Sequence, residues 1–236
     1  MNNRPLADVI VPVYNEAECL ETFYRRVKAL GIELNLIFID NNSEDDSCKI
    51  METFEGVTLI RHKKNEGYGG SILDGIAQSG NENIIIIDAD CEFPPECIPA
   101  LLENLNKNAV VHASRLKNKK SAKAAGMPYM KWLGNYLISA LFNMLFKQST
   151  TDLYTGCKAL KRSALDSLAL KQTGFEHVLE LSARLAQKGY RIQEIPVDFV
   201  PRSTGISKMQ HVSELGKFLF FLVCFYLQNP KAKNEK

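Results

Sequence analysis

The stretch Ile84–Glu96 reads Ile-Ile-Ile-Ile-Asp-Ala-Asp-Cys-Glu-Phe-Pro-Pro-Glu and decides the fold of this chain. Four consecutive isoleucines predict a strand that is buried on both faces. The strand ends in two aspartates one residue apart, at the carboxyl end where open α/β sheets bind their ligands. Pro94 and Pro95 stop the strand and can open the next helix at its first turn.

Asp88 and Asp90 form a pair of carboxylates whose burial is costly unless a cation neutralises them. Oxygen ligands of this kind suit Mg²⁺ or Mn²⁺, and such an ion usually contacts a nucleotide phosphate as well. An acidic surface turn is the alternative interpretation, because an Asp-x-Asp pattern alone is a weak signal. The metal interpretation therefore depends on support from the rest of the chain.

Apolar and amphipathic runs alternate through the first half of the chain. The expected strands are Asp8–Tyr14, Leu34–Asp40, Val57–Arg61, Ile84–Asp88 and Ala109–Ala113. The expected helices are Glu18–Leu30, Asp45–Phe54, Gly70–Gln78 and Pro95–Asn106. This order predicts an α/β fold with a mainly parallel, twisted sheet flanked by helices.

The second half follows a different pattern after a basic loop at Arg115–Lys123. The expected elements are a strongly apolar helix Tyr129–Lys147, a helix Glu176–Lys188, a strand Tyr190–Val200 and a last helix capped by Ser213. The last helix carries the apolar run Phe218–Leu227. We expect one domain over residues 1–211, with halves 1–114 and 115–211, followed by an apolar helix and basic tail at 212–236.

Composition narrows the class of protein. A net charge of only +2 over 236 residues argues against general nucleic-acid binding. The six cysteines form no Cys-x-x-Cys pair, which argues against a zinc site and a disulfide framework and fits a reducing, cytoplasmic compartment. The amino terminus lacks the apolar core of a signal peptide, and no stretch reaches the roughly 20 apolar residues that cross a bilayer.

Polar motifs follow each of the first four expected strands. They are Val11–Glu16, Asp40–Ser43, Asn65–Gly70 and the pair Asp88 and Asp90. Each motif alone is explained by a turn or a helix cap. Because a parallel sheet brings such ends to one edge, the four together predict a ligand site. The glycines fit neither a dinucleotide fingerprint nor a Walker A loop.

These motifs resemble those of inverting nucleotide-sugar glycosyltransferases of family 2, which have the A-type, Rossmann-like fold. Within that family the chain is similar to the dolichol-phosphate mannose synthase and polyprenyl-phosphate sugar transferase branch. The resemblance runs from about Asp8 to Lys208 and includes Thr151–Ala159 and Arg202–Lys208. Three positions depart from it: Asn41 replaces a second acid, Glu92 a common glutamine, and Cys157 an aromatic residue.

The resemblance implies a site for a nucleoside diphosphate sugar. Donor-nucleotide contacts would come from Pro12, Tyr14, Glu16, Asp40, Asn65, Gly67, Gly70, Asp88, Ala89 and Asp90. Asp88 and Asp90, with Glu92 as a helper, would hold Mg²⁺ or Mn²⁺. The catalytic residues would be Asp88, Asp90, Asp152, Arg202 and Lys208, and the acceptor phosphate would meet Arg115, Arg202, Ser207 and Lys208.

The resemblance further implies metal-dependent transfer of a mannose- or glucose-type hexose to a polyprenyl or dolichyl phosphate. A phosphate acceptor is already anionic near neutrality and needs cations more than a base. The alternatives are a soluble or glycan hydroxyl acceptor, which would need a base such as Glu176 or Glu180, and a non-catalytic sugar-nucleotide-binding protein. Tyr129–Lys147 and Phe218–Leu227 suit the cytoplasmic membrane surface, with core packing or a dimer seam as the other interpretation.

Overall fold

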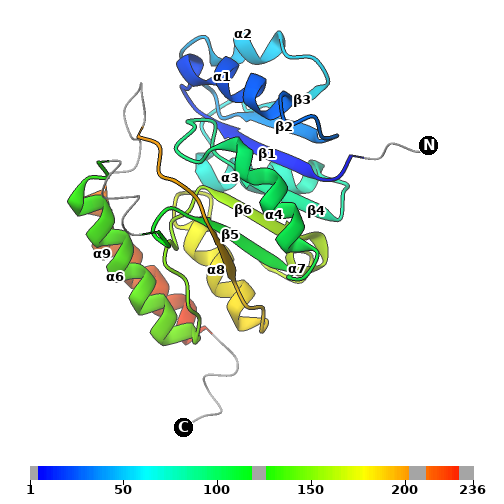
Figure 1. The fold of residues 1–236 in the computed structure, drawn as a ribbon. Helices are drawn as coiled ribbons and strands as arrows, with labels where there is room; N and C mark the ends of the chain where they lie inside the picture. Colours follow the sequence, from blue (N-terminus) through cyan, green and yellow to red (C-terminus); the bar gives the residue numbers. More distant parts are fainter. Residues whose placement is uncertain (1–4, 119–125, 202–210, 229–236) are drawn as a thin grey trace.

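A computed structural model describes residues 5–118, 126–201 and 211–228, with the backbone alone for 211–215. The described residues form a seven-stranded sheet in the order β3-β2-β1-β4-β6-β5-β7 (Figure 1). The strands are β1 (Asp8–Val13), β2 (Asn35–Asp40), β3 (Val57–Arg61), β4 (Asn83–Ile87), β5 (Val110–Ser114), β6 (Cys157–Lys161) and β7 (Gln193–Pro196).

The sheet is mainly parallel, as the sequence predicts. β1 pairs in parallel with β2 and β4, β2 with β3, and β5 with β7. Only β6 runs the other way, between β4 and β5. The carboxyl ends of β1 to β4 therefore meet at one edge of the sheet.

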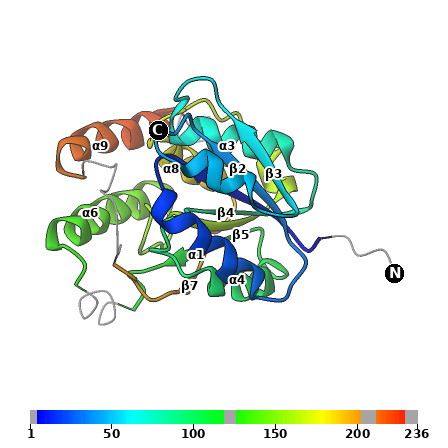
Figure 2. The ribbon, with the colours of Figure 1, turned by 90° about the horizontal axis from the view of Figure 1, so that it is seen from above.

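Helices cover both faces of the sheet (Figure 2). One layer contains α1 (Ala17–Lys28), α2 (Ser47–Glu52) and the short turn η1 (Pro95–Cys97) with α4 (Ile98–Leu105). The other contains α3 (Gly67–Gln78), α6 (Tyr129–Phe146), α8 (His177–Gln187) and α9 (His211–Leu227). The short helix α7 (Arg162–Leu165) follows β6 directly.

The isoleucine run explains why β4 lies at the centre. Ile85 and Ile87 pack into the core on the α1 side, and Ile84 and Ile86 pack into the core on the α3 side. All four side chains are 0% exposed. Full burial of each stabilises the fold by about 1.5–3 kcal/mol, which fixes the strand at the position the sequence predicts.

Glycines allow α3 to approach its neighbours closely. A Cβ atom at Gly75 would overlap Ile10 of β1, so the helix lies directly against the sheet. A Cβ atom at Gly69 would lie 2.5 Å from the backbone oxygen of Gln172, in the segment before α8. These contacts place the first turn of α3 at the carboxyl edge of the sheet.

Three expectations about the second half are wrong. β6 is absent from the predicted strands, because the polar residue Lys158 interrupts the apolar pattern that marks a buried strand. In the structure Lys158 is nevertheless only 1% exposed. The predicted strand Tyr190–Val200 shrinks to β7, because its partner β5 ends at Ser114, which accepts a last hydrogen bond from the Val197 N–H at 3.0 Å. α9 begins at His211, so Ser213 lies inside the helix and does not cap it.

α9 belongs to the same core as the rest of the fold. It packs against α6 and α8 (Figure 1), and it buries Phe218, Leu222 and Phe225. These side chains share one hydrophobic cluster with residues of α6 and α8. None of the helices in the described part of the chain is long and apolar enough to span a bilayer.

Candidate active site

A cavity of about 400 Å³ lies at the carboxyl edge of the sheet. Its walls come from the ends of β1, β2 and β4, the first turn of α3, and residues of α6, α8 and α9. The volume falls in the range of small-molecule sites. The four polar motifs of the sequence contribute to one site, with at least one residue each on its wall: Tyr14, Asn41, Asn65 and Asp88.

The loops after β1 and β2 are tied to each other. Asn15 has a positive φ of 54°, its backbone N–H donates to Ser43 Oγ at 3.0 Å, and its Oδ1 accepts from the Glu44 N–H at 2.7 Å. Asparagine tolerates this left-handed conformation better than most residues. The turn holds Tyr14 and Glu16 on the cavity wall.

Asn41 lies on the wall with its amide group fixed from both ends. Its Oδ1 accepts from the Glu66 N–H at 2.8 Å and lies 3.0 Å from Nδ1 of His62. Its Nδ2 donates to Asn65 Oδ1 at 3.0 Å. The asparagine thus connects the loops after β2 and β3, where the resemblance led us to expect an acid.

Asp88 and Asp90 follow β4 and both line the cavity. Tyr68 donates its hydroxyl to Asp88 Oδ1 at 2.8 Å, and Asp90 Oδ1 accepts from the Glu92 N–H at 2.9 Å. A Cβ atom at Gly156 would overlap Asp88 Oδ2, so this approach requires glycine. Tyr68 and Gly156 therefore set the position of the first carboxylate.

Burial, and then the charge of Asp90, raise the pKa of Asp88 to about 7. Burial also lowers the pKa of the nearby Lys158 to about 8, although the charge of Asp88 opposes that shift. The protein thus disfavours the charged form of Asp88, whereas a divalent cation bound at this carboxylate would favour it.

The residues fit a metal that also binds a ligand. Among residues 5–118, 126–201 and 211–228, no three His, Cys, Asp or Glu side chains gather closely enough to hold an ion by themselves. Mg²⁺-type ions are commonly held by one or two carboxylates and completed by water and substrate phosphates. Asp88 and Asp90 match that donor set.

A charge cluster lies at the end of the cavity beside the Asp pair, formed by Glu92, Arg115, Lys131 and Asp152. Arg115 makes two bonds to Asp152, Nε to Oδ2 at 2.8 Å and Nη2 to Oδ1 at 3.0 Å. Its Nη1 lies 3.0 Å from Glu92 Oε2, and Lys131 Nζ lies 2.7 Å from both Glu92 oxygens. The cluster joins the loops after β4 and β5 to α6.

Arg115 and Asp152 stabilise each other's charged forms. Burial acts to lower the pKa of Arg115, but Asp152, together with Glu92 and Asp90, outweighs burial and the net shift is upward. Burial acts to raise the pKa of Asp152, but Arg115 outweighs it and the net shift is downward. Arg115 is 4% exposed, so the first residue of the expected basic loop is buried.

α6 turns its polar stripe inward. Lys131 and Asn135 line the cavity, Asn135 donates to Asp152, and Ser139 accepts from the Leu153 N–H at 3.0 Å. The apolar outer face looks away from the protein and consists of Tyr129, Met130, Tyr136, Leu137 and Met144 of α6 with Phe220, Val223 and Leu227 of α9. An ordinary surface helix instead turns its apolar face toward the protein and its polar face toward solvent.

Aromatic side chains form the remaining wall. Tyr68 stacks on Phe175 with centroids 5.3 Å apart, and Tyr154 packs on Phe218 at 5.0 Å. All four line the cavity. The cavity therefore has a polar end near β1 and β2, a carboxylate pair in the middle, and an end near α6, α8 and α9 that holds the charge cluster and the aromatic side chains.

Most of the predicted site residues meet at this cavity. Those on its wall are Pro12, Tyr14, Glu16, Asn65, Gly67, Asp88, Ala89, Asp90, Glu92 and Arg115. Asp40, Gly70 and Asp152 are buried and lie outside the wall. Arg202, Ser207 and Lys208 lie outside the described residues.

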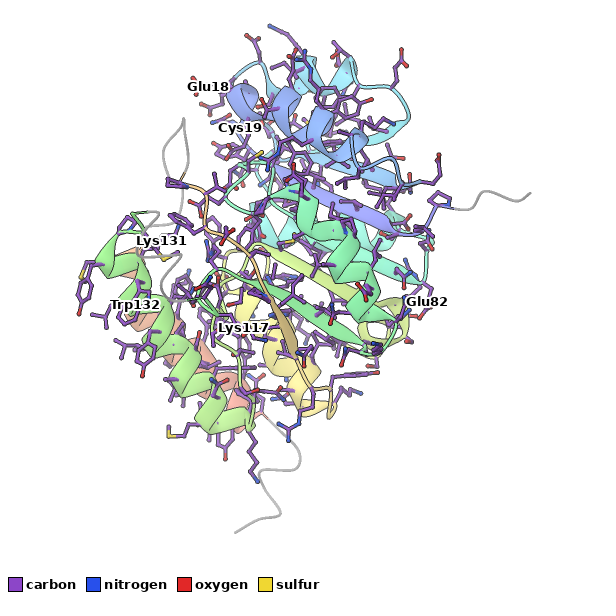
Figure 3. The ribbon with its side chains drawn as sticks, viewed as in Figure 1. Glu18, Cys19, Glu82, Lys117, Lys131 and Trp132 are labelled. Atoms are coloured by element: carbon purple, nitrogen blue, oxygen red, sulfur yellow. The ribbon has the colours of Figure 1, made fainter. Side chains whose placement is uncertain are left out.

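Sequence reasoning missed several residues of the site. They are Tyr68, Lys131, Asn135 and Lys158, to which the sequence assigned no role in the site. Of these, Lys131 is labelled on α6 in Figure 3. Lys131, Asn135, Ser139 and Asn143 recur every four residues, which places them on one face of the helix but does not show which way that face points.

Solved structures identify the class of this fold. The glucosyl-3-phosphoglycerate synthase of Mycobacterium tuberculosis with Mn²⁺, UDP and glucosyl-3-phosphoglycerate superposes with a TM-score of 0.66 at 17% identity, over 93% of this chain and 79% of that one. A mannosyltransferase from Pyrobaculum calidifontis with GDP-mannose and Mn²⁺ gives 0.62 at 19%, over 98% and 72%. The fold is that of the A-type glycosyltransferases.

The sequence narrows the class further. The profile of glycosyl transferase family 2 matches residues 8–169, and the chain belongs to that family. The protein is a glycosyltransferase.

Curated relatives include enzymes named for polyprenyl-phosphate acceptors. A dolichol-phosphate mannosyltransferase of Pyrococcus furiosus is 27% identical over 90% of this chain and 60% of its own length. An undecaprenyl-phosphate mannosyltransferase of Micrococcus luteus is 27% identical over 85% and 86%. A dolichol-phosphate mannosyltransferase of Saccharomyces cerevisiae is 26% identical over 93% and 96%. The chain thus spans less than two thirds of the Pyrococcus relative and most of the other two.

We predict that Asp152→Asn destabilises the protein by about 3–5 kcal/mol, because it leaves the buried Arg115 without its main counter-charge. Urea unfolding of the two proteins measures the change. The matched control is Asp166→Asn, whose carboxylate is 62% exposed and lies 3.8 Å from Arg162. That variant should change stability by less than about 1 kcal/mol. Equal losses of stability in the two variants would contradict the claim that Asp152 is the main counter-charge of the buried Arg115.

Proposed function

We propose that this glycosyltransferase moves a mannose- or glucose-type hexose, with inversion, from a nucleoside diphosphate sugar to a polyprenyl phosphate. The observation that carries the proposal is the position of Arg115 and Lys131 at one end of the cavity. Lys131 belongs to α6, and the outer face of that helix is apolar. An acceptor with an anionic head and a hydrocarbon tail matches both features. The names of the relatives support the same acceptor class.

The donor nucleotide fits the polar end of the cavity. Asp88 and Asp90 would hold Mg²⁺ or Mn²⁺, and the ion would stabilise the negative charge that grows on the departing diphosphate. Tyr68 orients Asp88, so the protein fixes the ligand before substrate binds. The nucleotide-bearing neighbours of similar fold support a sugar-nucleotide donor.

The acceptor phosphate fits the end that holds Arg115 and Lys131. A phosphate monoester carries about −1.5 to −2 charges at neutral pH, so its oxygen attacks without a protein base. Glu180 accepts the Lys171 and Gln172 N–H groups at 2.8 Å each, and Glu176 lies 3.5 Å from Lys217. These contacts favour structural roles for both glutamates over base catalysis on a hydroxyl acceptor.

The proposal also includes three residues that lie outside the described part of the chain. Arg202, Ser207 and Lys208 are predicted phosphate contacts, because an arginine fork and a lysine both suit phosphate oxygens. Asp152 acts through Arg115 in this scheme, since it is 0% exposed and lies behind the cavity wall.

The apolar outer face would rest on the cytoplasmic membrane surface. Exposed aliphatic and aromatic side chains on adjacent helices form a patch of the kind that marks membrane or protein contacts. Lys147 and Lys217 are exposed on the same two helices, where anionic headgroups would favour them. A membrane position would also bring the cavity to the lipid that carries the acceptor phosphate.

We predict that the purified protein with Mn²⁺ transfers labelled hexose from GDP-mannose or UDP-glucose to undecaprenyl phosphate. Asp90→Asn should lower the rate by roughly 100-fold or more, because it removes a metal ligand. Asp166→Asn serves as the control and should retain activity. Transfer to sugar hydroxyls alone, or full activity of Asp90→Asn, would contradict the proposal.

A second prediction concerns the apolar outer face. Met144 is 71% exposed and Phe220 is 66% exposed, so Met144→Glu with Phe220→Glu places charge where lipid is expected. Sedimentation with phosphatidylglycerol vesicles should show at least about tenfold weaker binding, since each apolar side chain contributes about 1.5–3 kcal/mol when buried.

Leu6 is the matched control for vesicle binding. It is 52% exposed, precedes β1 and lies on neither α6 nor α9, so Leu6→Glu should leave binding unchanged. Unaltered vesicle binding by the double variant, or its conversion from dimer to monomer in light scattering, would assign the face to protein contacts instead.

A further inference from the structure

Glu92 occupies the position where the acceptor phosphate is expected to find its cations. Lys131 Nζ lies 2.7 Å from both Glu92 oxygens, and Arg115 Nη1 lies 3.0 Å from Glu92 Oε2. The Glu92 side chain is 11% exposed, so water screens these ion pairs only weakly. The sequence suggested that Glu92 helps to bind the metal, but its carboxylate is engaged from the α6 side.

Counted over its own four side chains, the charge cluster is neutral. Arg115 and Lys131 carry two positive charges, and Asp152 and Glu92 carry two negative charges. An arriving phosphate would therefore meet no net attraction from the cluster, and it would be repelled by the Glu92 carboxylate itself. Favourable binding requires that at least one cation turn from Glu92 to the phosphate.

Lys131 is the cation that can change partners. Arg115 is fixed by its two bonds to Asp152 and by its guanidinium 4.5 Å from the centre of the Phe93 ring. Lys131 is bonded to Glu92 and lies 5.4 Å from the centre of the Phe199 ring. A lysine has a flexible stem and three donors, so it can move its ammonium group without leaving the cavity wall.

We propose that Glu92 is a positioning and affinity-setting residue that holds Lys131 in the absence of acceptor and competes with the acceptor phosphate for it. This inference rests on the proposed function. The carboxylate keeps the two cations together when the site is empty, at the expense of acceptor affinity. A neutral side chain of the same size would keep the geometry and remove the competition.

The test is the affinity of Glu92→Gln for farnesyl phosphate, measured by calorimetry with Mn²⁺ and the nucleoside diphosphate present. We expect the Kd to fall about three- to tenfold, which corresponds to the loss of one partly screened ion pair that phosphate must otherwise displace. In steady-state assays the acceptor KM should fall likewise, while the donor KM and the Mn²⁺ concentration for half-maximal activity stay unchanged.

Lys131→Met is the matched variant, because the gain should depend on Lys131. In the Lys131→Met background, Glu92→Gln should improve binding by less than about twofold if the two side chains act as one pair. An unchanged or weaker Kd for Glu92→Gln would overturn the inference, and so would an equal gain in both backgrounds. A raised Mn²⁺ requirement would assign Glu92 to the metal and also overturn it.

Two further outcomes separate the inference from the proposed function. If wild type and Glu92→Gln both fail to bind farnesyl phosphate, the proposed acceptor class and the role of Glu92 fail together. If wild type binds it and Glu92→Gln binds equally well, only the role of Glu92 fails. A purely structural role would lower the unfolding temperature of Glu92→Gln with no change in acceptor Kd, which also overturns the inference.

Discussion

The buried pair of Arg115 and Asp152 is the interaction on which the site depends. An arginine with a side chain 5% exposed is tolerated only beside a well-placed counter-charge, and Asp152, at 0%, supplies it through two bonds. The pair joins the end of β5 to the segment before β6, and Asn135 and Glu92 extend it to α6 and β4. Charge balance in the interior thus places α6, and with it Lys131, against the carboxyl edge of the sheet.

The same edge gathers the remaining chemistry. Parallel pairing of β1 to β4 brings the polar loops after these strands together, and the glycines of α3 let its first turn approach them. Asp88 and Asp90 then lie between a polar end, where we propose that the nucleotide binds, and the end with Arg115 and Lys131, where we propose that the acceptor phosphate binds. In the proposed transfer both substrates bear phosphate, so a bound ion would supply positive charge at one end and Arg115 and Lys131 would supply it at the other.

The local patterns of the first half were sufficient to predict β1 to β4 and the loops that follow them. All four side chains of Ile84–Ile87 can be buried only if the strand lies at the centre of a sheet that is covered on both faces. The position of the Asp pair at the end of that strand therefore follows from the sequence. The second half depends on contacts between distant residues. Lys158 interrupts the apolar pattern that would have marked β6. The inward orientation of the polar residues of α6 depends on the contacts of Asn135 with Asp152 and of Lys131 with Glu92, which are 17 and 39 residues apart in sequence. Periodicity alone leaves open which side of such a helix faces the protein.

The central claim is that Asp88 and Asp90 bind a divalent ion together with the diphosphate of the donor. Anomalous scattering from crystals grown with Mn²⁺ and a nucleoside diphosphate tests it directly. The account predicts a manganese peak in contact with an oxygen of Asp90 and with oxygens of the diphosphate. A nucleotide bound in the cavity with no manganese at these carboxylates would contradict the account.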